Sequence, residues 1–400
     1  MNKAFLSFVR RCFIALALLA LISPAALADD ATADTWYFGG TGQETIYEAT
    51  PLPNGCLLLN GSTQLGRNGQ EQLAFESREK RAWLLCLNPD LSVAWEVIDD
   101  AKGTTRYVVP QVLQDGRIAV LYYNSPSQVT VEAAIRYFTQ DGEPAGEVPL
   151  PAESPFDLPG DRCAGGYVFA GYDMEMVFVD ESGSRILPGE EEPKVHGSQR
   201  DALATADGRI VAGSCYSNGE RRAAIVCMDA QGTERWRFSP DEYAEGAFGF
   251  PYLQSDGSVI FALLQKEPGA DERTITRILC LDAEGGLLWD HPMPDGAGTT
   301  FAPVEGGFIL ARCQLEKTYM HIRFTRVDES GQALEVREAE PRKDGFSGDK
   351  LFFWNGEAWL LYNAERAANR VNDQQAELEL ADGALVRVSA CPPAGAQDAP

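Results

Sequence analysis

The sequence has few residues suited to catalysis or metal binding. It contains only three histidines, His196, His291 and His321. None of them lies within about three to five residues of another histidine or of a cysteine, which is the spacing of zinc sites. It also has no Gly-x-Ser-x-Gly nucleophile turn, no paired-histidine zinc motif and no phosphate-binding glycine loop. We therefore expect no resident metal and no cofactor, and no catalytic residue is recognisable.

Acidic loops are the remaining candidates for a metal site, because calcium prefers carboxylate oxygens. One loop contains Asp99 and Asp100, and another contains Asp241, Glu242 and Glu245. Neither loop has the alternating spacing of oxygen ligands that is typical of a calcium-binding loop. We interpret both loops as solvated acidic surface.

Basic residues are also scarce. The 34 Lys and Arg residues are outnumbered by 59 Asp and Glu residues, which gives a formal net charge of −25. Nucleic acids and anionic membranes attract proteins through Lys and Arg side chains that neutralise fixed negative charge. The composition therefore argues against both as partners and indicates an acidic surface that resists aggregation.

Long apolar runs are absent except near the N-terminus. There Lys3, Arg10 and Arg11 precede an apolar run at 12–22, which is followed by the small-residue triplet at 26–28. This order predicts a signal peptide at 1–28 and a mature chain that begins at Asp29. The alternative is a retained anchor, but the run has about half of the ~20 residues that a spanning helix needs. We expect a secreted or extracytoplasmic monomer with no membrane span after cleavage.

What the sequence does contain is a repeat. A turn pair such as Asn-Gly, Asp-Gly or Gly-Gly precedes a short apolar run seven times, at a period of roughly 50 residues. The glycines that end these turns are Gly55, Gly116, Gly166, Gly208, Gly257, Gly307 and Gly356. Each unit reads as four short strands separated by turns. We predict an all-β fold, a seven-bladed β-propeller of four-stranded antiparallel blades at 29–391, with a disordered tail at 392–400. A solenoid is the alternative, but capping units are not recognisable.

The two ends of the chain are expected to meet. The segment at 35–40 aligns with the segment at 94–97, which is the last strand of the first complete unit. We predict that it pairs into the last blade, around 376–389, so that no sheet edge stays open at the seam. The alternative is that 384–389 fills this outer place itself and the N-terminal segment packs elsewhere.

A tryptophan closes the repeat in three units, at Trp95, Trp236 and Trp289. A large ring at a repeated position is expected to wedge between neighbouring units. The strings from Leu279 to Trp289 and from Met228 to Trp236 resemble the tryptophan-docking repeat of the pyrroloquinoline-quinone type propeller superfamily. The resemblance implies a propeller. Quinone-dependent members carry an adjacent cysteine pair over the cofactor, and this chain has none, so the resemblance is to the non-catalytic members, among them an outer-membrane assembly factor.

One position of the repeat, directly before the second turn, varies between units. It holds Cys86, Tyr137, Phe178, Cys227, Cys280 and Arg326 in turn. A position that accepts these residue types is a packing position, so we interpret its cysteines as small buried apolar residues. A chain of this size needs no disulfide scaffold. If one disulfide exists, we expect it between Cys56 and Cys86.

Function is predicted only coarsely. We expect an exported, non-enzymatic propeller that acts as a binding or scaffold module for a protein, peptide or glycan. The alternative is a glycan-active hydrolase or lyase at the mouth of the central channel, because propellers bring carboxylates together from distant blades. A sensor domain is a third hypothesis. At the channel mouth, two or three carboxylates with an arginine or a tyrosine, facing a pocket on the order of several hundred Å³, would favour the enzyme. A flat or lysine-blocked mouth would favour the scaffold.

Aromatic residues in the loops that lead into each unit are candidates for a ligand surface. They are Phe248, Phe250, Phe301, Phe346 and Trp354. Packing between blades explains the same residues.

Overall fold

The computed structural model describes residues 35–38, 44–63, 80–99, 101, 103–125, 132–150, 161–163, 166–170, 176–187, 196–205, 208–217, 220–229, 234–239, 246–254, 256–266, 274–292, 300–316, 319–328, 332–339, 345–367 and 379–390. The predicted signal peptide at 1–28 and the predicted tail at 392–400 lie outside these residues. The described segments are almost entirely strands, and their one helical element is a short 3-10 turn, η3 (Val388–Ala390). The all-β prediction is confirmed. No helix in these segments is long and apolar enough to cross a membrane.

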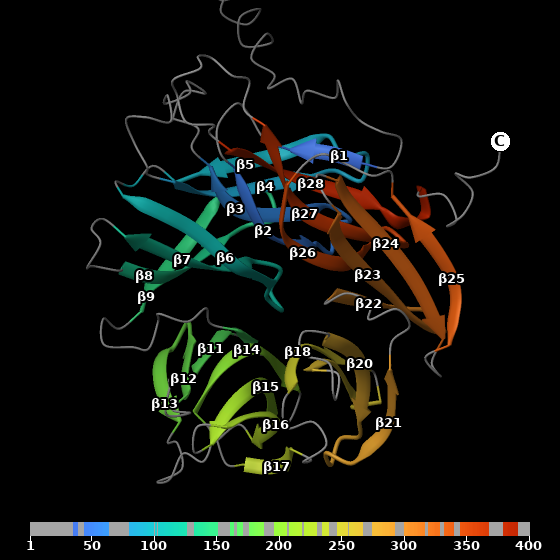
Figure 1. The fold of residues 1–400 in the computed structure, drawn as a ribbon. Coiled ribbons are helices and arrows are strands. Elements are labelled where there is room, and N and C mark those ends of the chain that lie inside the picture. The colour runs from blue at the N-terminus through green and yellow to red at the C-terminus, as the bar shows by residue number, and fades with distance from the viewer. Residues whose placement is uncertain are drawn as a thin grey trace, which may run out of the picture.

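The strands form four-stranded antiparallel sheets that follow one another along the chain (Figure 1). Sheet 1 contains β2 (Thr45–Pro51), β3 (Leu57–Thr63), β4 (Arg81–Leu87) and β5 (Val93–Ile98). Sheet 2 contains β6 (Thr104–Val112), β7 (Ile118–Ser125), β8 (Glu132–Phe138) and β9 (Pro144–Pro149). Sheet 3 contains β10 (Asp161–Cys163), β11 (Gly166–Ala170), β12 (Met176–Asp180) and β13 (Gly183–Leu187). Sheet 4 contains β14 (His196–Thr205), β15 (Gly208–Ser217), β16 (Glu220–Asp229) and β17 (Glu234–Phe238).

The C-terminal half of the chain continues the pattern. Sheet 5 contains β18 (Gly246–Leu253), β19 (Val259–Lys266), β20 (Thr274–Leu281) and β21 (Leu287–Pro292). Sheet 6 contains β22 (Thr300–Val304), β23 (Gly307–Glu316), β24 (Tyr319–Asp328) and β25 (Ala333–Glu338). Sheet 7 contains β26 (Gly345–Trp354), β27 (Glu357–Ala367), β28 (Glu379–Arg387) and, from the other end of the chain, β1 (Thr35–Phe38). Sheets 1 to 6 are open meanders, and sheet 7 has the same strand arrangement with β1 in the outer place. Four-stranded sheets of this kind are the blades of β-propellers.

Neighbouring sheets pack face to face, and the hydrophobic core lies between them. The inner strands are buried on both faces, so they read as continuous apolar runs rather than as an alternation. One cluster joins Leu58 of sheet 1 to Val120 of sheet 2, and another joins Phe324 of sheet 6 to Leu360 of sheet 7. Sheets 2 and 3, 4 and 5, and 5 and 6 share clusters of the same kind, and β10 contacts β14 between sheets 3 and 4.

The N-terminal strand joins the last sheet. β1 pairs antiparallel with β28, with Thr35 opposite Val386 and Phe38 opposite Gly383, which agrees with the expected pairing at 376–389 (Figure 1). The alternative, in which 384–389 takes the outer place, is wrong, because β28 lies between β27 and β1. Sheet 7 also packs against sheet 1 in one hydrophobic cluster that contains Leu361 and Leu57.

The tryptophans wedge between sheets as predicted. The indole Nε1 of Trp95 donates to the carbonyl oxygen of Gln140 at 2.8 Å. In the same way Trp236 in sheet 4 donates to Ala283 of sheet 5 at 2.9 Å. Each indole sits on the glycine of the turn it reaches, so that a Cβ on Gly142 would lie 2.7 Å from Cδ2 of Trp95. The third tryptophan of the repeat, in sheet 5, packs on a phenylalanine of sheet 6.

The cysteine predictions have different outcomes. Cys86, Cys227 and Cys280 are buried, which confirms the packing interpretation. The Cys56–Cys86 disulfide is wrong, because both are free thiols. The register places Leu58, not Cys56, opposite Cys86, so the two cysteines are not a directly facing pair. Burial, followed by the neighbouring Cys56, raises the pKa of the Cys86 thiol to about 12.

The close contact between the Trp95 indole and Gly142 gives a stability prediction. We expect Gly142→Ala to lower the free energy of unfolding by about 2–5 kcal/mol, because the methyl group meets the indole and φ is +82°. Gly257→Ala is the matched control. Its φ is +87°, but its Cβ would lie 3.8 Å from the nearest side chain, so about 1–2 kcal/mol is expected. Urea unfolding of both variants measures the difference, and equal losses would contradict the wedge.

Candidate functional site

A cavity of about 400 Å³ lies between sheets 6 and 7. Its polar lining consists of Glu305, Arg326, Glu335, Arg337, Glu357 and Ser389. Its apolar lining consists of Val304, Ile309, Phe324, Phe353, Ala358 and Val388. The volume is in the range of about 300–1,000 Å³ that is typical of ligand pockets. We call this cavity the seam pocket, because sheet 7 is the sheet in which the two ends of the chain meet.

The seam pocket coincides with a break in the repeat. In three sheets the third strand carries a buried cysteine opposite the docking tryptophan of the fourth strand. These pairs are Cys86 with Trp95, Cys227 with Trp236 and Cys280 with Trp289. In sheet 6 the same position, followed by the same register shift, pairs Arg326 with Glu335. Both residues of this exchanged pair line the seam pocket.

Sheet 7 also lacks the turn on which an indole from the preceding sheet would sit. Elsewhere the indole sits on the turn that joins the third strand of the next sheet to its fourth strand. Sheet 7 has no such turn, because its fourth strand is β1 and the chain leaves β28 through η3. A side chain of a different kind makes the contact with sheet 7. The Nη1 of Arg337 donates to the carbonyl oxygen of Ser389 at 2.8 Å.

Two of the glutamates in the pocket accept hydrogen bonds from neighbouring side chains. The Nη2 of Arg337 lies 2.7 Å from Oε1 of Glu335. The hydroxyl of Ser389 donates to Oε2 of Glu357 at 3.0 Å, and Nε of Arg387 lies 3.6 Å from the same oxygen. These contacts fix both carboxylates against the protein, so they shape the wall of the pocket.

Arg326 and Phe353 are exposed residues of the pocket lining, as are Glu305 and Ser389. Nη2 of Arg326 donates to the carbonyl oxygen of Glu305 at 3.2 Å, and the side chain is exposed. Phe353 is 46 % exposed, which is unusual for a phenylalanine at the end of a core strand. An exposed guanidinium beside an exposed ring can recognise a ligand that has both an anionic or polar group and an apolar face.

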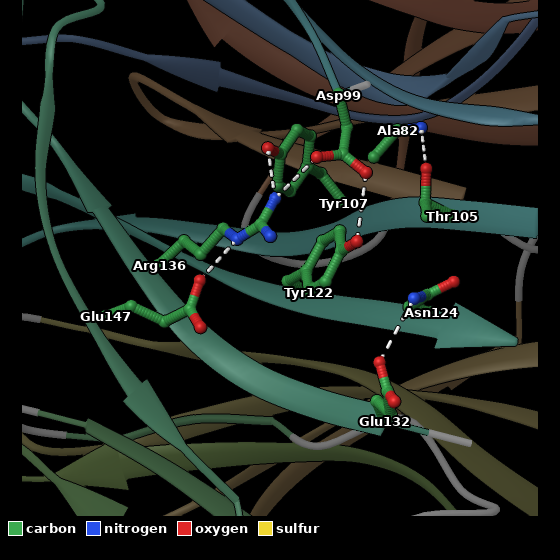
Figure 2. Close-up of polar contacts among 9 residues, drawn as sticks. All are labelled: Ala82, Asp99, Thr105, Tyr107, Tyr122, Asn124, Glu132, Arg136 and Glu147. Atoms are coloured by element: carbon green, nitrogen blue, oxygen red, sulfur yellow. Dashed lines mark hydrogen bonds and ion pairs between the residues drawn. The ribbon is translucent and has the colours of Figure 1, made fainter. Parts of the chain in front are cut away.

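A second polar cluster lies between sheets 1 and 2 (Figure 2). Asp99 follows β5 and accepts from the hydroxyl of Tyr122 at 2.9 Å and from Nη1 of Arg136 at 2.9 Å. Nη1 of Arg136 also donates to the Tyr107 hydroxyl at 3.0 Å, and Nε donates to Glu147 at 2.7 Å. The guanidinium stacks on the Tyr122 ring, with Cζ 3.4 Å from the ring centre.

Within this cluster Asp99, Arg136, Tyr107 and Tyr122 satisfy one another, and we call these four residues the structural lock (Figure 2). Both oxygens of Asp99 have partners, so this residue, a candidate calcium ligand from the sequence, is engaged in holding sheet 2 to sheet 1. Burial raises the pKa of Tyr107 to about 12, although the adjacent Arg136 opposes that shift. Burial and the hydrogen bond to Asp99 also raise the pKa of Tyr122. Both hydroxyls therefore stay protonated at neutral pH.

The other predicted site residues are not brought together. Among the described parts of the chain, no group of three or more His, Cys, Asp or Glu side chains is arranged to hold a metal. His196, His291 and His321 lie in sheets 4, 5 and 6. Asp100, Asp241, Glu242 and Glu245 lie outside the described residues.

The aromatic candidates are explained by packing where they can be assessed. Trp354 is 3 % exposed and Phe301 is also buried, each within a hydrophobic cluster. Phe248, Phe250 and Phe346 lie in strands β18 and β26, and their side chains are outside the described ones. Sequence reasoning missed the seam pocket, although the signal was present: Arg326 was aligned with buried residues of the other units, and no tryptophan follows it.

No protein-family profile and no curated protein matches this chain. Solved structures with a similar fold include a sialidase of Trypanosoma rangeli in complex with the inhibitor DANA, at 8 % identity and a TM-score of 0.42, covering 86 % of this chain and 55 % of the sialidase. Another is a puromycin hydrolase mutant complexed with PGG, at 14 % identity and a TM-score of 0.46, covering 81 % of this chain and 52 % of the hydrolase. The chain thus spans about half the length of these two proteins.

A third similar structure is the α-L-arabinanase of Penicillium chrysogenum complexed with arabinobiose, at 11 % identity and a TM-score of 0.41. The match covers 89 % of this chain and 98 % of the arabinanase. At TM-scores below 0.5, none of these likenesses transfers an activity to this chain. The resemblance to the tryptophan-docking superfamily stays a prediction.

The structural lock gives a second prediction. We expect Asp99→Asn to lower the free energy of unfolding by about 2–4 kcal/mol, because it leaves the half-buried Arg136 without its buried counter-charge. Glu147→Gln is the matched control. Its side chain is 47 % exposed, so the loss should stay below about 1 kcal/mol. Equal effects in urea unfolding would show that Asp99 does not hold the guanidinium.

A third prediction concerns alkaline pH. Because the pKa of Tyr107 is raised from 10.0 to about 12 in the folded chain, its contribution to stability is complete below pH 10 and is lost as the pH rises toward 12. Urea unfolding between pH 8 and pH 11 should therefore show a falling free energy of unfolding. Tyr107→Phe should make this fall shallower. An unchanged slope in the variant would contradict the buried, protonated hydroxyl.

Proposed function

We propose that the chain is an exported, non-enzymatic β-propeller whose seven sheets close into one ring, and that it is a binding module with its recognition site in the seam pocket. Export rests on the leader at 1–28. Closure is supported by two observations: β1 pairs with β28, and sheet 7 shares a hydrophobic cluster with sheet 1. A buried contact between these sheets adds to it, since Asn363 of β27 donates to the carbonyl oxygen of Ile46 at 2.9 Å and accepts from its N–H at 2.7 Å.

The proposed binding function rests on one observation. Arg326 and Glu335 stand in sheet 6 where three other sheets have a packed Cys–Trp pair. A Cys–Trp pair stabilises the contact between two sheets, whereas Arg326 and Glu335 leave a cavity there. Residues that lower packing density without an evident gain in stability are typical of functional sites. The pocket also exposes an arginine fork and an aromatic ring, which are groups that dominate recognition surfaces.

Binding is favoured over catalysis by the state of the carboxylates. Glycoside cleavage needs two carboxyl groups that are free to deliver a proton and to reach the sugar or a water. In the seam pocket Glu335 is paired with Arg337, and Glu357 accepts from Ser389. Both are occupied in holding the wall.

A glycan-active enzyme is the second candidate, because a specific observation favours it. Three glutamates and two arginines face one cavity of about 400 Å³. These are the residue types that the sequence argument named for an enzyme, although it expected them at the mouth of the channel. Glu305 would then be the carboxylate available for chemistry, since its described contact is made by its backbone carbonyl.

The test is binding of the purified mature chain to a peptide array and a glycan array, together with turnover of aryl glycosides. We expect binding that Arg326→Ala with Phe353→Ala weakens at least about tenfold. Leu288→Ala, an exposed apolar side chain on β21 away from the pocket, should leave binding unchanged. Turnover that Glu305→Gln abolishes would establish the enzyme instead. Binding that is insensitive to the double variant would exclude the seam pocket as the site.

A further inference from the structure

The cavity between sheets 6 and 7 lies where the repeat places a tryptophan side chain in sheets 1, 4 and 5. Where the repeat is intact, the indole lies between two sheets and its N–H reaches a backbone carbonyl of the following sheet, as Trp95 and Trp236 do. In sheet 6 the residue in register at that position is Glu335, whose side chain is drawn to Arg337. The site of the missing ring is therefore open rather than filled by another residue of the chain.

The walls of this space suit an aromatic ring. Phe324 and Val388 belong to the core cluster between sheets 6 and 7, and Ile309 packs against it. Phe353 stands exposed at the edge of the same cavity. An inserted ring would bury apolar area against Phe324, Val388 and Ile309 and would stack with Phe353. Contacts between aromatic rings stabilise a complex by more than their buried area alone.

The charge in the pocket identifies what should accompany the ring. Glu335 is compensated by Arg337, Glu357 lies beside Arg387, and Glu305, the third glutamate of the lining, is exposed to solvent. Arg326 differs from these arginines: within the described part of the chain its hydrogen bond is to a backbone carbonyl, which carries no net charge. A guanidinium with several donors remaining is suited to a carboxylate, which it can hold in a two-pronged contact. On a chain with a net charge of −25, an acidic ligand is repelled over most of the surface and is favoured at such a place.

We propose that the seam pocket binds a peptide segment of a partner protein by taking up a tryptophan side chain followed by an acidic residue. The indole occupies the space that the repeat's own tryptophan fills elsewhere, and the acidic side chain pairs with Arg326. This inference rests on the proposed binding function and specifies its ligand.

The experiment uses the mature chain and three octapeptides that are identical except at two central positions, where they carry Trp-Asp, Trp-Asn or Ala-Asp in a Gly-Ser background. Isothermal titration calorimetry measures each dissociation constant. We expect the Trp-Asp peptide to bind about tenfold or more tightly than the Trp-Asn peptide, and the Ala-Asp peptide not to bind measurably. Equal affinities of all three peptides would overturn the proposal.

Two variants locate the binding. Arg326→Gln should abolish the preference for Trp-Asp over Trp-Asn, whereas Arg117→Gln, an exposed arginine of sheet 2 that pairs with Glu181 of sheet 3, should preserve it. Arg326→Cys with Glu335→Trp restores the pair found in the other sheets and should close the pocket to every peptide. A melting temperature equal to or above that of the parent chain shows that this variant is folded. Tryptophan-peptide binding that persists in it would overturn the assignment to the seam pocket.

The outcomes separate this inference from the function on which it depends. If none of the octapeptides binds, but ligands found on the arrays do bind and are lost with Arg326→Ala and Phe353→Ala, the binding function stands and the tryptophan–acid ligand is wrong. If the double variant leaves array binding unchanged, both are wrong.

Discussion

The seating of an indole on the turn of the next sheet is the contact on which the arrangement of this protein depends. A four-stranded sheet has two apolar faces and cannot cover either by itself, so each sheet must pack against two others. Apolar packing alone would allow one sheet to slide over the next. The hydrogen bond from Trp95 to Gln140 and the close approach of its ring to Gly142 fix where sheet 2 lies on sheet 1. The same pair of contacts recurs between sheets 4 and 5.

The seam pocket lies at a junction where this contact is not available. Sheet 7 takes its outer strand from the N-terminus, so it has no turn after β28 on which an indole could sit. Sheet 6 carries Glu335 where sheets 1, 4 and 5 carry tryptophan, and Arg337 makes the contact with Ser389. A cavity of about 400 Å³ remains at this junction, where Arg337 provides a second means of holding the sheets together.

The structural lock between sheets 1 and 2 is a second way of fixing the position of one sheet on the next. Asp99, Arg136 and two buried tyrosines satisfy one another across the junction (Figure 2). Such a network adds direction to an interface that apolar packing leaves adjustable, because each group loses a partner when the sheets shift. The two sheets are therefore held by an indole seat and by a charged network. Sheets 6 and 7 are held by core packing, by Arg337 and by a hydrogen bond from the Leu351 N–H to the Thr300 hydroxyl.

The sequence by itself determined the strands, the four-stranded units, the pairing of 35–38 into the last sheet and the wedging tryptophans, because these depend on local turn chemistry and on a period that the chain repeats. Tertiary structure alone decided which side chains meet. Cys56 and Cys86 do not form the expected disulfide, because a register difference of two residues separates them. Asp99 belongs to the structural lock because Arg136, which lies in a different sheet, donates a hydrogen bond to it. Arg326 looked like one more packing residue in the repeat, and only the packing of sheet 6 against sheet 7 places it in the wall of a pocket. Contacts across sheets join residues far apart in the chain, and no local pattern records them.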